Sequence, residues 1–202
     1  MNGKVIKGIA IGIGTLIVSG GTAIAKYIKD IETKKKEEQE RYNNEIITCD
    51  ICGAKMVRKT GTQLEVLTDE LRYGCPVSPE VLNYICKKVM KDNKSEQLAC
   101  PKCKSEIKDR IQELIKRALN YEDVKDYPIT YKGQIDYNPQ ITQEICTDWH
   151  RNRIRAGIVL RQLAAVDGFD VIYNCEEEWT KKYEGNYIKN LCKYKGIASH
   201  KI

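Results

Sequence analysis

The sequence predicts an α+β protein built from several small parts. These parts are an N-terminal transmembrane helix, a charged helical stalk, a four-cysteine module with a helical insertion, and a C-terminal unit of strand, helix and hairpin. Three observations lead to this prediction: an uncharged block at the N-terminus, two C-x-x-C pairs between residues 49 and 103, and alternating strand and helix patterns after them. The segments are residues 1–25, 26–45, 46–104, 105–120 and 121–202.

The composition narrows the classes of function. The net charge of +6 comes from lysines scattered among acidic residues, which argues against a nucleic-acid-binding protein because such proteins gather basic residues on one face. Nine cysteines are an odd number, unlike a secreted disulfide framework. Two histidines, His150 and His200, leave little material for histidine-based catalysis.

The N-terminal block, residues 8–25, carries no charge. As a helix it would rise about 27 Å, close to the roughly 30 Å hydrocarbon core of a bilayer. Gly8 and Gly12 form a small-residue pair that would let two such helices approach, so a homodimer through this face is one expectation. More lysines and arginines follow the block than precede it, which predicts a single-pass membrane protein with its C-terminal domains in the cytoplasm.

A cleaved signal peptide is the alternative for the same segment. Lys4 and Lys7 would form its basic start, and Ala23-Ile24-Ala25 reads as a cleavage site. The mature protein would then be secreted, beginning after Ala25.

The stalk, residues 26–45, mixes basic and acidic side chains and has almost no apolar ones after Ile31. Opposite charges four residues apart, such as Glu32 and Lys36, favour a solvated helix. We interpret it as a spacer because it has no apolar face to bury.

The strongest chemical signal is a pair of C-x-x-C knuckles, which supply Cys49, Cys52, Cys100 and Cys103. Two residues between thiolates let one tight turn direct both sulfurs at one ion, and two such turns make the tetrahedral set that Zn2+ prefers. Gly53 suits the left-handed backbone of such a turn. Redox-active dithiols or two local disulfides are the alternatives.

The two knuckles resemble those of the zinc-ribbon family, which often read CxxCG and CPxC. The 47 residues between Cys52 and Cys100 exceed the common spacing and predict an insertion. Within it we expect strands at residues 55–59 and 63–68, then a helix that begins at Ser78-Pro79. Cys75 and Cys86 also lie there, and the sequence leaves their state open between free, disulfide-bonded and metal-bound.

An amphipathic helix follows at residues 105–119. Its apolar residues repeat at helical spacing and predict packing against the zinc module: Ile107, Ile111, Leu114, Ile115 and Ala118.

The C-terminal unit is expected to contain a strand at residues 127–135, a helix at 151–166, and two hairpin strands at 169–176 and 187–200. A hairpin turn at Tyr183-Glu184 would place Cys175 opposite Cys192, whereas a turn at Gly185 would shift this register. These two cysteines could form a thiol pair, a disulfide, or half of a metal site with His150.

The same unit carries a second resemblance. The stretch LAAVDGFDVI at residues 163–172, with Cys175 and Cys192 beyond it, resembles the C-terminal half of the bacterial Rcs envelope-stress lipoprotein sensor. It is also similar to a small family named for heavy-metal binding. The resemblance covers about residues 145–202 and implies disulfides among cysteines at the places held here by Cys146, Cys175 and Cys192.

Together these observations predict a membrane-tethered, zinc-binding interaction or sensor module that is not an enzyme and that presents surfaces to a protein partner. A structural zinc site leaves no open position for catalysis. The alternative is a secreted or envelope protein that senses thiol oxidation, and a thiol oxidoreductase ranks third. Cys146 and His150 lack a third, orienting group, so we do not expect a nucleophile and base there.

Overall fold

The computed structural model describes residues 21–90 and 97–202. Its contacts divide the chain into two units. One comprises the chain up to Ile47 together with Val57–Lys59, and the other comprises Thr48–Met56 and Thr60–Ile202. Each unit is described by itself.

The first unit is dominated by the helix α1 (Gly21–Asn44). Its charged sequence forms the solvated helix expected of the stalk, and its side chains from Tyr27 onward are almost all exposed. Near its end, Arg58 forms an ion pair with Glu45 at 2.7 Å and lies 4.3 Å above the ring of Tyr42.

The structure contradicts the expected transmembrane helix. None of the helices in residues 21–90 and 97–202 has the length and apolar character needed to cross a membrane. The only part of the expected span that is described, residues 21–25, is continuous with the charged α1, whose basic and acidic side chains are costly to bury in hydrocarbon. The predictions of a single-pass anchor and of a membrane location are therefore wrong. The rest of that span lies outside the described residues, as does the proposed Gly8/Gly12 helix face.

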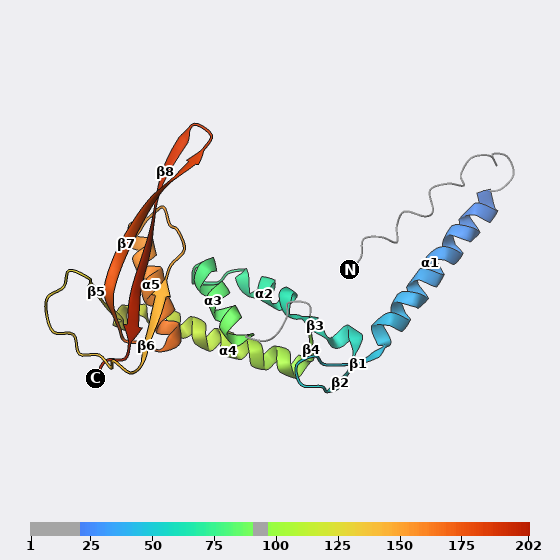
Figure 1. Ribbon diagram of the computed structural model, residues 1–202. Helices are drawn as coiled ribbons and strands as arrows, with labels where there is room; N and C mark the ends of the chain where they lie inside the picture. The colour runs from blue at the N-terminus through green and yellow to red at the C-terminus, as the bar shows by residue number, and fades with distance from the viewer. Residues whose placement is uncertain (1–20, 91–96) are drawn as a thin grey trace. The chain divides into compact units, whose positions relative to one another are not determined.

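The second unit is a mixed α+β structure (Figure 1). Its helices are α2 (Leu64–Arg72), α3 (Pro79–Val89), α4 (Pro101–Leu119) and α5 (Arg153–Asp167), with a short 3-10 turn at Tyr121–Asp123. Another 3-10 turn, Arg58–Thr60, belongs mostly to the first unit. Its strands include β3 (Thr62–Gln63), β4 (Leu98–Ala99), β5 (Lys125–Pro128), β6 (Thr142–Cys146), β7 (Val171–Glu184) and β8 (Tyr187–Ser199). Two further short strands, β1 (Ile46–Thr48) and β2 (Lys55–Val57), flank the first C-x-x-C knuckle, and each contains residues assigned to both units.

One four-stranded sheet organises the C-terminal half, with the order β5-β7-β8-β6. The long strands β7 and β8 form an antiparallel hairpin, β6 pairs antiparallel with β8, and β5 pairs parallel with β7. In Figure 1 the hairpin extends well beyond the ends of β5 and β6.

The helix α5 packs on both sides, which explains why apolar residues occupy nearly all of its positions from Ala156 to Val166 other than Arg161 and Gln162. On one side Val159, Leu163 and Val166 join α3 and α4 in a helical core around Ile85 and Ile111. On the other side its residues meet the sheet in a second core: Leu160 and Ala164 pack there with Ile172 and Ala198. The four-cysteine region, the insertion and the sheet are thus joined through α4 and α5.

Two expected strands differ from the structure. Residues 64–72 form α2 because Leu64, Leu67 and Leu71, spaced for one helical face, are buried or half-buried. The strand expected at residues 127–135 ends at Pro128, after which the chain turns, with the Tyr131 amide bonded to the Pro128 carbonyl at 2.8 Å.

The hairpin register also differs from the one we expected. The strands turn at Gly185-Asn186, so Glu184 pairs with Tyr187 and Trp179 pairs with Cys192. Gly185 has a φ of 59°, which a two-residue hairpin turn with glycine first requires. Cys175 and Cys192 are therefore not opposite each other. They lie about four residues apart along the ladder, roughly 13 Å, beyond the reach of a disulfide.

Candidate metal centre

The four cysteines of the two knuckles, hereafter the four-cysteine cluster, lie together in the fold. The sulfurs of Cys49, Cys52, Cys100 and Cys103 all lie within 4.8 Å of one another. That separation suits four ligands around one ion with metal–sulfur bonds near 2.3 Å. The four cysteines are thus positioned to bind a metal ion, as the paired knuckles predicted.

The first knuckle is a tight turn closed by its own backbone. The Gly53 amide donates to the Cys49 carbonyl at 2.9 Å, and the Cys49 amide donates to the Ala54 carbonyl at 2.8 Å. Gly53 has a φ of 70°, the left-handed conformation that glycine adopts without strain. This turn brings both sulfurs to the same side of the chain.

The second knuckle is the first turn of α4. Cys100 is the N-cap of this helix, Pro101 follows it, and the Cys103 amide points to the Cys100 sulfur at 3.5 Å. The helix was expected to begin only at residue 105, whereas α4 begins at Pro101, so that Cys100 caps it and Cys103 lies in its first turn. Pro101 was the available signal, because proline favours the first position of a helix.

Asp50 joins the two knuckles. Its amide donates to the Leu98 carbonyl at 3.0 Å, and its carboxylate accepts from the Leu98 amide at 2.7 Å. Sequence reasoning did not identify this role, since a surface aspartate in a turn gives no sign of a partner 48 residues away. These two bonds bring β4, and with it Cys100, to the first knuckle.

Burial and hydrogen bonding give the four sulfurs different environments. Cys49, Cys100 and Cys103 are buried, whereas Cys52 is exposed. Burial opposes ionisation of Cys49, but hydrogen bonds from the backbone amides of Cys52 and Cys100 outweigh it and lower the pKa of this thiol to about 6. For Cys103, burial and then the neighbouring sulfurs raise the pKa well above its usual value. The cluster thus favours one thiolate and resists additional negative charge, which a divalent cation would offset.

The remaining cysteines do not form a second cluster of this kind among the described residues. All nine cysteines are free of disulfides. Cys86 is buried within the helical core, and Cys75 packs against that core. Burial raises the pKa of the Cys86 thiol. The disulfides implied by the resemblance to the envelope sensor are therefore absent from the described structure.

His150 is held by a carboxylate rather than by a thiol. Its Nε2 atom lies 2.8 Å from Glu80, and the other oxygen of Glu80 accepts from the Asp148 amide at 2.5 Å. Its backbone pairs with that of Cys192 as a short bridge. Cys146, by contrast, contacts the Thr147 carbonyl at 3.4 Å. The side chains of Cys146 and His150 thus have separate partners.

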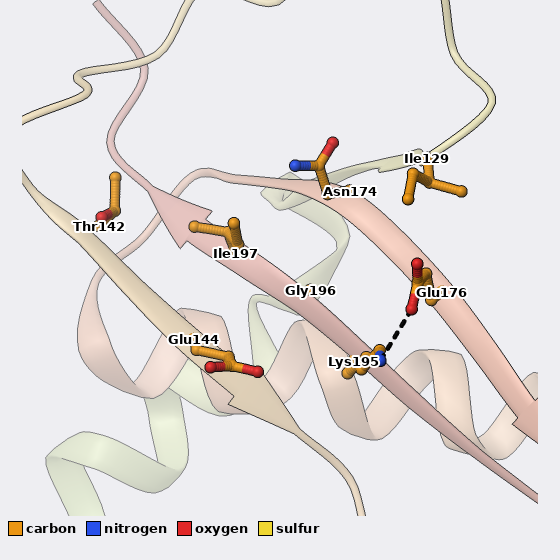
Figure 2. Close-up of a pocket in the computed structure, with 8 residues that line it drawn as sticks. All are labelled: Ile129, Thr142, Glu144, Asn174, Glu176, Lys195, Gly196 and Ile197. Atoms are coloured by element: carbon orange, nitrogen blue, oxygen red, sulfur yellow. Dashed lines mark ion pairs between the residues drawn. The ribbon is translucent and has the colours of Figure 1, made fainter.

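A cavity of about 430 Å³ lies on the face of the sheet opposite α5 (Figure 2). Its polar lining includes the ion pair of Glu176 and Lys195 at 2.8 Å, with Glu144 on the neighbouring strand. Asn174, whose φ is 53°, occupies a bulge at its rim. Neither a cysteine nor a histidine lines this cavity, so we assign no catalytic or metal-binding role to it.

The chain matches no family model, no curated protein and no solved structure. The resemblances to zinc ribbons and to the envelope-stress sensor are thus not supported by any family match, and the geometry of the four-cysteine cluster alone carries the argument for metal binding.

Proposed function

We propose that the protein is a non-catalytic interaction module whose fold depends on one structural Zn2+ held by the four-cysteine cluster. The observation that carries this proposal is the mutual separation of the four sulfurs, within 4.8 Å. Four thiolates satisfy a tetrahedral zinc ion completely and leave no position for a substrate or an activated water.

The choice of zinc rests on the ligand type. A set of four thiolates in two C-x-x-C knuckles selects zinc or iron over the oxygen-preferring Mg2+ and Ca2+. Zinc has no redox chemistry of its own, and its structural sites in proteins are almost always tetrahedral. Both properties suit a purely structural centre.

The position of the cluster explains what the ion would stabilise. It joins the turn around Cys49 to the start of α4, and α4 in turn packs on α5 beside the sheet. Because the ligands come from both ends of the insertion, binding energy at the cluster becomes folding energy for this region. The module so ordered would then present its exposed surface to a protein partner.

Substitution with Co2+ tests whether the centre is structural or catalytic. We expect the cobalt-loaded full chain to show the ligand-to-metal absorption of a tetrahedral four-thiolate site, unchanged by added imidazole or azide. A spectral change on adding these ligands would mean an open coordination position and would contradict a non-catalytic role.

Hydrogen exchange with and without a chelator tests the structural role separately. Removing the metal should increase exchange in the knuckles and the first turn of α4, while β7 and β8 near α5 keep their protection. Unchanged exchange at the knuckles would contradict the proposal.

A further inference from the structure

The outer edge of β7 is a long run of unpaired strand. β5 covers this edge only as far as Cys175, and the residues from Glu176 to Glu184 have no strand on that side in the part of the chain that the structure describes. Figure 1 shows this part of the hairpin standing clear of β5 and β6. An exposed edge of this length is a template for pairing with another strand.

The register identifies the backbone groups that face outward. Cys192 bonds with His150 on the side away from β7, through both its amide and its carbonyl, at 2.8 and 2.7 Å. Trp179, directly opposite Cys192, therefore directs its own amide and carbonyl away from β8. By the alternation of an antiparallel ladder, Glu177, Lys181 and Tyr183 do the same.

The charges nearest Thr180 are complementary to themselves in the antiparallel direction, although at the ends of this edge Glu176 would lie opposite Glu184 of the second copy. The edge begins with three acidic residues, Glu176 to Glu178, passes through Trp179 and Thr180, and continues with Lys181 and Lys182. Pairing with a second copy about Thr180 would place Glu178 opposite Lys182 of the second copy, and Trp179 opposite Lys181 of the second copy. A parallel arrangement would instead align like charges.

The side chains on the same ribbon are those that interfaces favour. Trp179 is 57% exposed, Tyr183 is 69% exposed and Ile188, opposite Tyr183, is 60% exposed. Aromatic residues are enriched in interfaces, and they are costly to leave in water when clustered. In the described structure these three lie on one face of a two-stranded ribbon.

We infer that the β7 edges of two copies of this chain pair antiparallel about Thr180, giving a symmetric dimer through a continuous sheet. The outward residues at 177, 179, 181 and 183 meet their counterparts in this register, so the outward backbone groups of each edge find partners. The same surface serves both copies, as a two-fold interface requires. This inference does not depend on the metal centre.

The mass of the full chain in solution tests the inference. Light scattering over a concentration series should give twice the 23.1 kDa chain mass at high micromolar concentration, with dissociation on dilution. A mass of one chain throughout the series would overturn the inference.

A matched pair of proline variants then tests which edge is used. Lys181→Pro removes an outward amide from β7, and Asn190→Pro removes an outward amide from β8 at the position directly opposite. Proline is tolerated at a strand edge when its nitrogen faces solvent, so both hairpins should form, as circular dichroism can check. We expect Lys181→Pro to be monomeric and Asn190→Pro to remain dimeric; equal masses for the two variants would overturn the inference.

A charge variant tests the register without altering the backbone. Lys182 is exposed, and Lys182→Glu would place a carboxylate opposite Glu178 of the second copy at two symmetric positions. We expect the dimer to dissociate at roughly tenfold higher concentration than the unmodified chain. An unchanged dissociation constant would contradict pairing about Thr180.

Discussion

Gly168 shows how a single residue sets the end of an element. It caps α5 in the left-handed conformation with a φ of 84°, and its amide bonds back to the Ala165 carbonyl at 3.0 Å. Its position directs the chain into Phe169 and then β7. A side chain at Gly168 would meet no neighbouring atom within 4 Å, so the backbone conformation alone restricts this position.

Substitution at this glycine should therefore destabilise the protein through the backbone. We expect Gly168→Ala to lower the free energy of unfolding by roughly 1–2 kcal/mol, because an L-residue is disfavoured in the left-handed region. The measurement is chemical denaturation at equilibrium.

Gly157 provides the matched control, since it lies inside α5 and a Cβ there would also meet nothing within 4 Å. Gly157→Ala should raise the free energy of unfolding by about 0.5–1 kcal/mol, because glycine in a helix interior carries an entropic cost. Equal effects of the two substitutions would show that conformation does not govern Gly168.

At the scale of elements, one buried carboxylate links α3, α5 and β6. The side chain of Asp167, at the end of α5, is 2% exposed. It accepts from the Tyr84 hydroxyl at 2.5 Å and from Gln143 at 3.1 Å, and it pairs with Lys88. A buried charge with three partners is stable only while the partners remain, so this contact fixes the packing of the insertion helix on the C-terminal half.

Removal of the Tyr84 hydroxyl should be costly at neutral pH. We expect Tyr84→Phe to lower the free energy of unfolding by about 1–3 kcal/mol, since the hydroxyl donates to a charged, buried acceptor. The variant keeps the ring and so leaves the apolar packing in place.

The pH dependence of this difference gives a second readout. Burial, followed by the nearby Asp167, raises the pKa of Tyr84 to about 12 in the folded protein. A raised pKa means that the folded state holds the proton more tightly than the unfolded chain does. In the unfolded chain the pKa of a tyrosine is about 10. The stabilisation by Tyr84 is therefore complete below about pH 10 and is lost as the pH rises towards 12. The difference between the unmodified chain and Tyr84→Phe should shrink over this window; a constant difference would contradict the account.

The sequence predicted some elements well because their local signals agree with the tertiary structure. Ser78 caps α3 with Pro79 after it, Gly168 ends α5, and the paired knuckles converge. Residues 64–72 were predicted only in part as a strand because a short apolar run does not distinguish strand from helix until its burial is known. The hairpin register was missed because Gly185-Asn186, and not the cysteines, determines the turn.

At the scale of the whole molecule, the N-terminal prediction failed for a different reason. An uncharged block of helical length was interpreted as a membrane span, yet the described part of that block continues into a charged helix. The hydropathy of residues 8–25 gives no information about whether the last of these residues belong to the same helix as the charged residues that follow. The four-cysteine cluster needed no such context, because its chemistry is carried by residue type and by spacing within each knuckle.

The proposed function rests on the binding of one zinc ion by the four-cysteine cluster. The most direct test is the metal content of the purified full chain, with Cys103→Ser to remove one ligand and Cys86→Ser as the control at a buried thiol outside the cluster. We expect one zinc per chain in the unmodified protein and in Cys86→Ser, and a clear loss of zinc in Cys103→Ser. A chain that binds no metal when folded, or that binds the same amount after Cys103→Ser, would contradict the claim.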